Sequence, residues 1–288
     1  MLKGRLGLEK SRIPHSDRHG HLWLGYGALT VEDGCLKFVT AGWGDIEAGE
    51  YRIPHQTIST LLLGPGTSIS HDAFRLMNAH GGSICVVGED GVRIYTAPPL
   101  IPDHSEIARS HARIWSNETR RLDVARRMYA WRLGEVLPHR DIAILRGIEG
   151  ARVKESYKLA ASRYSISWDG RKYDRQNPEA SDEPNEALNH AATAVEAAAA
   201  IAVYSVGAIP QLGFIHEDSG HSFVLDIADL YRESITIDCA FAAVKSPEAK
   251  QRGLERVTRK MVGKRLQKDK VIPSMIDKIK LLISEANP

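Results

Sequence analysis

The chain has 288 residues, of which 43% are hydrophobic and 26% are charged, with a formal net charge of +2; this composition is typical of a globular protein with a substantial core and not of a disordered one. Residues 1–24 lack the apolar centre of a signal peptide, and no later stretch is long and apolar enough to span a membrane, so we expect a cytoplasmic protein without a membrane partner. Three scattered cysteines argue for a reducing compartment and against a zinc ribbon or a disulfide framework.

Residues 1–97 are predicted to form a small β domain. Short runs rich in Val, Ile, Leu and Tyr follow one another between turn signals, and the dipeptides Asp33-Gly34 and Asp90-Gly91 are typical of hairpins. The runs recur about every 8–12 residues, which favours a sandwich or a rolled sheet. One helix is expected within this domain, over residues 71–80.

The proline-rich segment PPLIP, residues 98–102, marks the predicted domain boundary, because the pattern becomes helical after it. Apolar residues recur at helical spacing over residues 107–134. Further helices are expected over residues 140–148, 151–164, 185–206, 224–233, 247–268 and 273–285. The predicted fold class is therefore α+β, with an N-terminal β-sandwich-like domain followed by a larger all-α domain over residues 98–288.

The charges are unevenly distributed, since an acidic segment over residues 181–240 lies between basic segments over residues 101–180 and 241–288. Basic flanks suit a polyanion such as nucleic acid. The acidic segment would repel that polyanion unless it held a cation. Charge clustering on solvated surfaces is the alternative, and the charge pattern alone does not decide between them.

Three stretches contain candidate functional residues. Glu149 lies between two glycines in LRGIEGARVK, where the backbone can approach closely, although a lone glutamate near a helix start is usually a partner of the helix dipole. Asp226 and Asp229 are three residues apart and share a helix face within an apolar pattern, and two carboxylates there need a partner or a cation. His216 ends the preceding apolar run; a buried histidine paired with a carboxylate is its alternative interpretation.

The third stretch is a basic run over residues 250–268, in which Glu255 is the only acid. The spacing of Arg252, Arg256 and Arg259 predicts one stripe on a helix, with Lys260 beside it. Solvent exposure is the default explanation for such a run, but its single sign of charge favours phosphate contact.

Together, one imidazole and two or more carboxylates form a mixed donor set. Oxygen ligands suit Mg²⁺ or Mn²⁺, and the imidazole shifts the preference towards Mn²⁺. Beside basic helices, such an ion would polarise a phosphodiester and stabilise the departing oxyanion.

The chain resembles the CRISPR-associated integrase family, the catalytic subunit of the spacer-acquisition complex, and its type I-E subgroup most of all. The resemblance covers roughly residues 22–271 and is most specific in LGYGALTVEDG, LGPGTSISHDAFRLMNAHGG, VGEDGVRIY, LRGIEGARVK, SWDGRKYD and GFIHEDSGHSFVLDIADLYR. It implies a dimerising β domain and a helical domain in which Glu149, His216 and Asp229 are the metal ligands and Asp226 is a supporting acid.

The same resemblance implies which residues and partners handle DNA. Tyr26 corresponds to a residue that stacks at the end of a duplex, Arg75 and Arg93 to basic positions near the DNA path, and Tyr173 to a position beside the active site. The implied assembly has two homodimers bridged by a small ferredoxin-like second subunit. The implied reaction is attack of a fragment's 3′-OH on a phosphodiester of the CRISPR repeat, with endonuclease activity when water replaces the hydroxyl.

Two features of the chain depart from the family pattern. The N-terminal cluster of His15, Asp17, His19 and His21 has no counterpart in the family, and we expect a flexible surface segment there rather than a metal site. The chain stops at Pro288, whereas type I-E relatives often have a proline-rich tail that touches the partner subunit and the DNA overhang.

Two other functional classes remain as alternatives. A non-catalytic DNA-binding scaffold would keep the basic surfaces without needing the metal ligands. A metal hydrolase for small phosphoesters would need neither the basic segments nor an exposed tyrosine at position 26.

Overall fold

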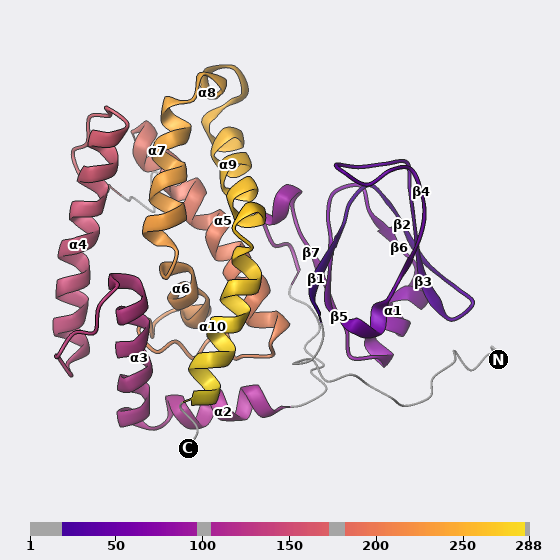
Figure 1. Ribbon diagram of the computed structural model, residues 1–288, viewed down its shortest axis with the longest axis horizontal. Coiled ribbons are helices and arrows are strands. Elements are labelled where there is room, and N and C mark those ends of the chain that lie inside the picture. The colour runs from indigo at the N-terminus through magenta and orange to yellow at the C-terminus, as the bar shows by residue number, and fades with distance from the viewer. Residues whose placement is uncertain (1–18, 97–104, 173–181, 286–288) are drawn as a thin grey trace.

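A computed structural model describes residues 19–96, 105–172 and 182–285 (Figure 1). Strands occupy the first part of the chain and helices the rest, which confirms the predicted α+β class. In Figure 1 the β part and the helical part stand side by side, and the turn after β7 approaches α9. His15, Asp17 and Tyr173 lie outside the described residues.

The strands form two sheets. The first is parallel and has the order β1 (His19–Leu24), β5 (Ile58–Leu63), β7 (Ser83–Val86). The second has the order β4 (Gly49–Ile53), β3 (Cys35–Thr40), β2 (Gly27–Glu32), β6 (Ser68–Ile69), and its β2–β6 pair is parallel while the other pairs are antiparallel. The helix α1 (His71–Ala79) packs against β2 and β7.

Strand β5 joins the two hydrophobic cores of the described chain. Its side chains alternate between faces, as the pleat of a strand requires: Leu61 and Leu63 belong to the core of the β part, whereas Leu62 belongs to the core of the helical part. A buried hydrogen bond of 2.9 Å between the hydroxyls of Thr60 and Ser205 also crosses between the two parts. Strand β5 is therefore buried along its whole length.

Both predicted turns are present. Asp33 and Gly34 have φ of +50° and +74° between β2 and β3, as a tight hairpin turn requires. Asp90 and Gly91 lie in the short turn η3 (Glu89–Gly91), also with positive φ, between backbone segments that pair antiparallel at Val87.

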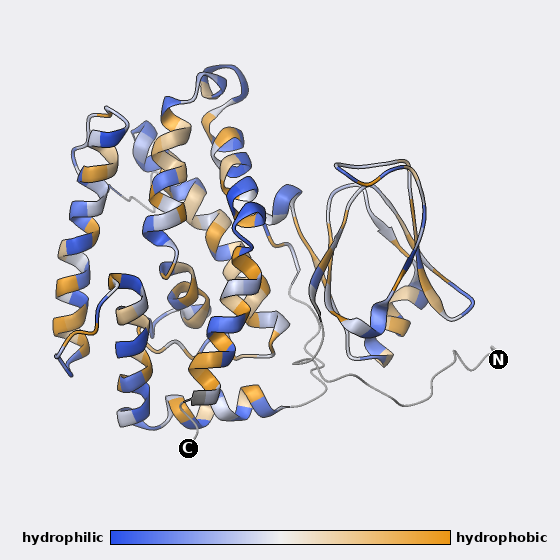
Figure 2. Cartoon of the chain, viewed as in Figure 1, coloured by the Kyte–Doolittle hydropathy of each residue, from blue (hydrophilic) through white to orange (hydrophobic). Residues whose placement is uncertain are grey.

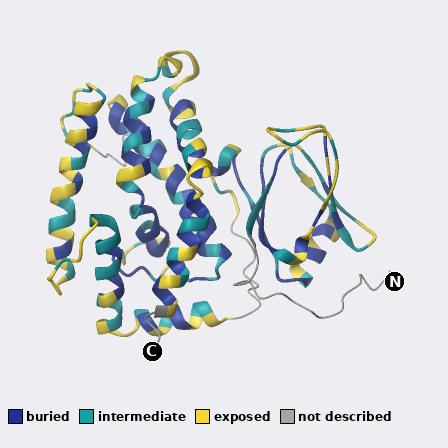
Figure 3. Ribbon diagram, viewed as in Figure 1, coloured by how far each residue is buried: buried dark blue, intermediate teal, exposed yellow. Residues whose placement is uncertain are grey.

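The helical part contains α2 (Glu106–Trp115), α3 (Glu118–Leu133), α4 (Ile142–Arg163), α5 (Glu183–Ser205), α6 (Ser222–Asp229), a π-helical turn η5 (Arg232–Ile237), α7 (Asp238–Lys245), α8 (Pro247–Arg252), α9 (Leu254–Lys268) and α10 (Val271–Glu285). Helix α5 lies at its centre and packs against α6, α7, α9 and α10. Most of its alanines are buried and let these neighbours approach closely (Figure 3). The helices of this part carry polar residues on their outward faces (Figure 2).

Several predicted helix boundaries were wrong. The helix expected over residues 224–233 begins at Ser222 and ends at Asp229, before the π-helical turn η5. The single helix expected over residues 107–134 is divided because the Asn117 side chain accepts from the Arg120 N–H and starts α3 there. Residues 142–163 form one helix instead of two, since single glycines inside a helix lose only about 1 kcal/mol relative to alanine. The predicted helix over residues 247–268 is interrupted at Gly253, whose φ is +85°.

In the described ranges, no helix is long and apolar enough to cross a lipid bilayer.

Candidate active site

Glu149 and Asp229 come together around one arginine. Glu149 lies about two turns into α4, and Asp229 is the last residue of α6. The Arg132 guanidinium, near the end of α3, lies between them, with Nη2 2.6 Å from Glu149 Oε1 and Nη1 3.2 Å from Asp229 Oδ2. Only 6% of the Arg132 side chain is exposed. This buried cation offsets the repulsion between the two carboxylates.

Arg232, three residues after Asp229, pairs with the other oxygen of the same carboxylate. The spacing is that of neighbours on one helix face. No other segment packs closely against the glycines that flank Glu149. A Cβ added at Gly147 or at Gly150 would meet nothing within 4 Å. The expected close backbone approach at these glycines was therefore wrong.

Asp226 is fully buried and holds the loop before α6. Its Oδ2 accepts from the backbone N–H groups of Phe214 at 2.6 Å and Ile215 at 3.1 Å, and its Oδ1 accepts from the N–H of His216 at 3.0 Å. The His216 ring also donates from Nδ1 to Oδ1 at 2.7 Å. Both oxygens of Asp226 are thus engaged within the protein, and the residue orients His216 instead of facing the cavity.

His216 turns its second nitrogen towards Asp229. Since Nδ1 donates to Asp226, Nε2 carries the lone pair, and it lies 4.0 Å from Asp229 Oδ2. The hydrogen bond to Asp226 raises the pKa of the His216 imidazole, against an opposing effect of burial. The side chain is 38% exposed, so a ligand can reach it.

Helix α2 fixes the other side of the same loop. The buried ring of His111 donates from Nε2 to the Leu212 carbonyl at 2.8 Å and accepts at Nδ1 from the Ile209 N–H at 3.2 Å. Burial lowers the pKa of His111 to about 4, so the ring stays neutral. Trp115 Nε1 donates to the Gly213 carbonyl at 2.8 Å, and a Cβ at Gly213 would lie 2.2 Å from the His216 carbonyl oxygen.

A cavity of about 1140 Å³ opens over Glu149 and Asp229. Four cationic side chains are among its lining residues, namely Arg146, Lys154, Arg171 and Arg232. Glu196 of α5 also lines it, and burial together with the nearby Asp229 charge raises the pKa of its carboxyl group. The cavity therefore combines an acidic floor with basic walls.

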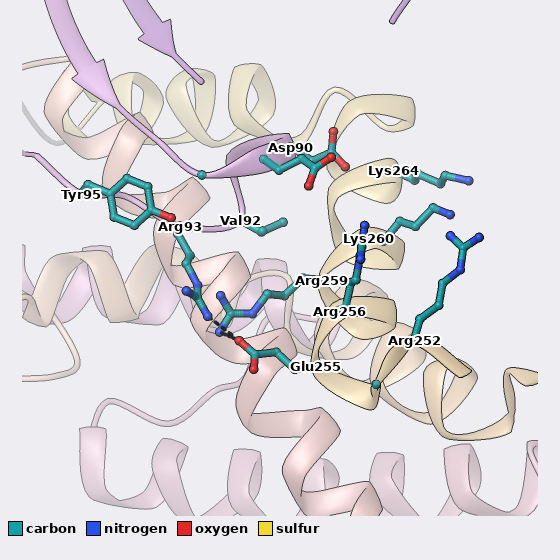
Figure 4. Close-up of a pocket in the computed structure, with 13 residues that line it drawn as sticks. Asp90, Val92, Arg93, Tyr95, Arg252, Glu255, Arg256, Arg259, Lys260 and Lys264 are labelled. Carbon is teal, nitrogen blue, oxygen red and sulfur yellow. Dashed lines mark hydrogen bonds and ion pairs between the residues drawn. The ribbon is translucent and has the colours of Figure 1, made fainter. Parts of the chain in front are cut away.

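Two further cavities continue from this one. A cavity of about 520 Å³ shares Thr193, Glu196, Ser219 and Leu225 with it. That second cavity shares Arg93 and Tyr95 with a third, of about 640 Å³, which lies against α9 (Figure 4). The shared lining residues show that the three cavities are neighbours, in order from the acidic floor to the basic helix.

The donor atoms fit a divalent cation such as Mg²⁺ or Mn²⁺. An ion about 2.0–2.2 Å from each ligand atom can bridge two donors up to roughly 4 Å apart, which is the separation of His216 Nε2 and Asp229 Oδ2. Glu149 lies on the other side of the Arg132 guanidinium, which contacts both carboxylates. Within the described residues, no three His, Cys, Asp or Glu side chains lie close enough together to enclose an ion. Glu149 would therefore have to shift relative to Arg132 before Glu149, His216 and Asp229 could bind one ion.

The sequence matches a known protein family over about half of its length and individual relatives over most of it. The profile described as CRISPR associated protein Cas1 matches residues 132–273. Proteins called CRISPR-associated endonuclease Cas1 from Clostridium sp. (strain SY8519) and Escherichia coli (strain K12) are 34% and 33% identical, covering 93% and 92% of this chain and 87% and 86% of their own length.

The chain belongs to the Cas1 family. A solved structure of a TtCas1–DNA complex has a TM-score of 0.83 and 29% identity and covers 95% of this chain and 99% of that one. A casposase bound to an integration product, at 14% identity and a TM-score of 0.65, shares the fold.

The residues expected to handle DNA lie on exposed parts of this Cas1 chain. Tyr26 is 47% exposed at a turn after β1, with φ of +52°, and is not packed within a sheet. Arg75 is on α1 and pairs with Asp72 at 3.2 Å, and Arg93 pairs with Glu255.

The expected basic stripe is interrupted. Arg252 belongs to α8, and Gly253 separates it from Arg256 and Lys260 on α9. Arg259 points inward, with 15% of its side chain exposed, and pairs with Glu255 at 3.0 Å. Arg256 and Lys260 still line the third cavity.

Several site residues escaped the sequence analysis. No local sequence pattern marked Arg132 as a site residue, because its partner Asp229 is 97 residues away in sequence. His111 and Glu196 looked like ordinary members of helical patterns. Arg232 was detectable, since a cation three residues after a helical aspartate is a standard pair.

Proposed function

We propose that this chain is a metal-dependent DNA endonuclease and integrase of CRISPR adaptation. It would insert captured DNA fragments into the CRISPR array by attack of a 3′-OH on a phosphodiester. The observation that carries the proposal is that the buried Arg132 guanidinium holds Glu149 and Asp229 together beside a cavity with basic walls, while His216 Nε2 lies 4.0 Å from the Asp229 carboxylate.

Glu149, His216 and Asp229 would hold a single Mg²⁺ or Mn²⁺, which when bound polarises the scissile phosphate and stabilises the leaving oxygen. Asp226 keeps Nδ1 of His216 protonated and leaves Nε2 free to bind the ion. His216 is therefore assigned as a ligand and not as a general base, since its lone pair is engaged. The guanidinium of Arg232, which also lines the cavity, would bind phosphate oxygens next to the ion.

The three neighbouring cavities would provide a path for DNA. Arg93, Arg256 and Lys260 line the end of this path against α9, and basic residues at these places would contact backbone phosphates. Tyr26, exposed at its turn, would stack on a terminal base, Arg75 would contact DNA along the β domain, and Tyr173 would lie beside the active site. The relative solved with DNA, TtCas1, supports DNA as the substrate.

We further propose an assembly and a cellular setting. Residues 1–97 would form the dimerisation domain of a homodimer, and residues 98–288 the catalytic, metal-binding domain. A small ferredoxin-like second subunit would bridge two such dimers in the cytoplasm, as in the type I-E subgroup.

Cleavage assays distinguish these functions. Branched or single-stranded-ended DNA is incubated with Mn²⁺ or with EDTA, and a small phosphoester serves as the control substrate. The proposal expects Mn²⁺-dependent DNA cleavage that His216→Ala abolishes, with DNA affinity nearly unchanged because Arg and Lys supply most of it. DNA binding without any cleavage would favour the scaffold, and preferential hydrolysis of the small phosphoester would favour the small-molecule hydrolase.

A further inference from the structure

The third cavity lies where the β part meets the start of α9. The turn η3 and Arg93 form one side, and residues from α8 and α9 form the other (Figure 4). Six of its lining residues are cationic and three are acidic. Its volume of about 640 Å³ is in the range of sites that bind small ligands or a nucleotide unit.

One acidic side chain, Glu255, lies between two of the arginines that line this cavity. A single oxygen of Glu255, Oε1, contacts Nη2 of both Arg93 and Arg259. In Figure 4 the two guanidinium groups lie against the Glu255 carboxylate, whereas Lys264 and Arg252 lie apart from it. The single negative charge of Glu255 therefore neutralises only part of the charge of the two arginines.

Arg259 still has hydrogen-bonding capacity left over. Its Nε and Nη1 are shielded from solvent and have no hydrogen-bond partner in the described part of the chain. Buried donors of a charged group are normally satisfied. An anion with more acceptor oxygens than one carboxylate, such as a phosphate, would satisfy them.

The start of α9 favours an anion in the same place. Gly253 supplies no side-chain cap, so the first N–H groups of this 15-residue helix lack that partner. Glu255 lies in this first turn, where the positive end of the helix dipole stabilises negative charge. A phosphate that replaced the Glu255 carboxylate would keep this favourable interaction.

We propose that this cavity binds a backbone phosphate of nucleic acid, and that Glu255 is a resident anion which the phosphate displaces. The inference rests on the proposed function, because it takes DNA as the ligand. Displacement frees Arg93 of the β part and Arg259 of the helical part to hold one phosphate together. Glu255 thereby lowers the affinity of any nucleic acid that has to displace it from the two arginines.

The test is Glu255→Gln, which keeps the size of the side chain and removes its charge. Binding of a fluorescent DNA duplex is measured against salt concentration for wild type and variant. We expect about a three- to tenfold gain in affinity at low salt, and a plot of log affinity against log salt that is steeper by about one unit, as for one additional phosphate contact. Thermal unfolding of both proteins confirms that the fold is kept.

Glu32→Gln is the matched control. Glu32 is 50% exposed and pairs with Lys37, whereas Glu255 is 47% exposed, so the two variants lose the same charge from similar surroundings. Glu32→Gln should leave the salt slope unchanged. Adding Arg259→Gln to Glu255→Gln should remove the gain, because the freed guanidinium is then absent.

The outcomes separate the inference from the function on which it rests. Wild type that binds DNA, with an unchanged slope for Glu255→Gln or an equal gain for Glu32→Gln, overturns the displacement alone. Wild type that binds no DNA overturns both. Displacement of the duplex by a free deoxynucleoside monophosphate would show a site for small phosphates and overturn the assignment to DNA.

Discussion

Asp226 and Asp229 share a helix, yet the structure gives them different tasks that a pair of substitutions can separate. Asp226→Asn replaces a buried carboxylate that accepts three backbone N–H groups and the His216 imidazole. Asp229→Asn replaces a partly exposed carboxylate that faces the cavity and pairs with Arg132 and Arg232.

The expected loss of stability follows from the number of hydrogen bonds that each side chain accepts. An asparagine at 226 keeps one acceptor oxygen and places an NH₂ group against N–H donors, so at least two bonds are lost. Because a hydrogen bond to a charged group contributes about 1.5–3 kcal/mol, Asp226→Asn should lower the free energy of unfolding by about 3–6 kcal/mol. Asp229→Asn leaves Arg132 paired with Glu149 and keeps one acceptor oxygen for Arg232, so it should lower the free energy of unfolding less, by about 1–2 kcal/mol.

Urea denaturation measures the stability of each variant, and calorimetric titration with Mn²⁺ measures its metal affinity. Asp229→Asn should abolish metal binding with only this smaller loss of stability. Asp226→Asn should be much less stable and bind metal weakly through its misplaced His216. Wild-type stability in Asp226→Asn, combined with complete loss of metal binding, would refute the positioning role and make Asp226 a ligand.

Two other predictions concern His111 and Tyr26. The folded protein keeps His111 neutral to about pH 4, whereas an unfolded chain protonates it near 6.5. The unfolded state therefore binds more protons as the pH falls. Relative to His111→Gln, wild type should lose about 1.4 kcal/mol of stability for each unit by which the pH falls between roughly pH 6 and 4. Denaturation at several pH values measures this difference, and parallel stability profiles for the two proteins would contradict it. Tyr26→Ala should weaken binding of duplexes with single-stranded ends by about 1–3 kcal/mol more than blunt duplexes, measured by fluorescence anisotropy; an equal loss for both, or loss of folding, would point to a packing role.

The sequence predicted the order of the elements better than their ends. The hairpin at Asp33-Gly34 and the helix at residues 71–80 were recognisable because local turn and capping chemistry determines them. The break at Asn117 was missed because a capping side chain outweighed a continuous apolar pattern. The unbroken helix through Gly147 and Gly150 was missed because helix packing outweighs the low propensity of isolated glycines.

The candidate site was only partly accessible from sequence. Residue types and spacing identified a donor set, but left Glu149 as an ordinary partner of the helix dipole until the family resemblance assigned it. The three-residue spacing of the aspartates could not tell which one faces the backbone of the preceding loop. That distinction depends on how residues 214–216 turn back towards α6, which is a tertiary feature.

The charge balance of the site bears on how metal and DNA bind together. Arg132 already compensates Glu149 and Asp229, so an arriving cation gains less from these carboxylates than it would from an unpaired set. If Glu149, His216 and Asp229 hold the ion as proposed, other oxygen atoms would have to complete its coordination. A phosphate held by Arg232 can supply some of them and adds negative charge next to the ion. Binding of metal and of DNA should therefore be mutually favourable, and by thermodynamic reciprocity each should raise the affinity for the other by the same factor.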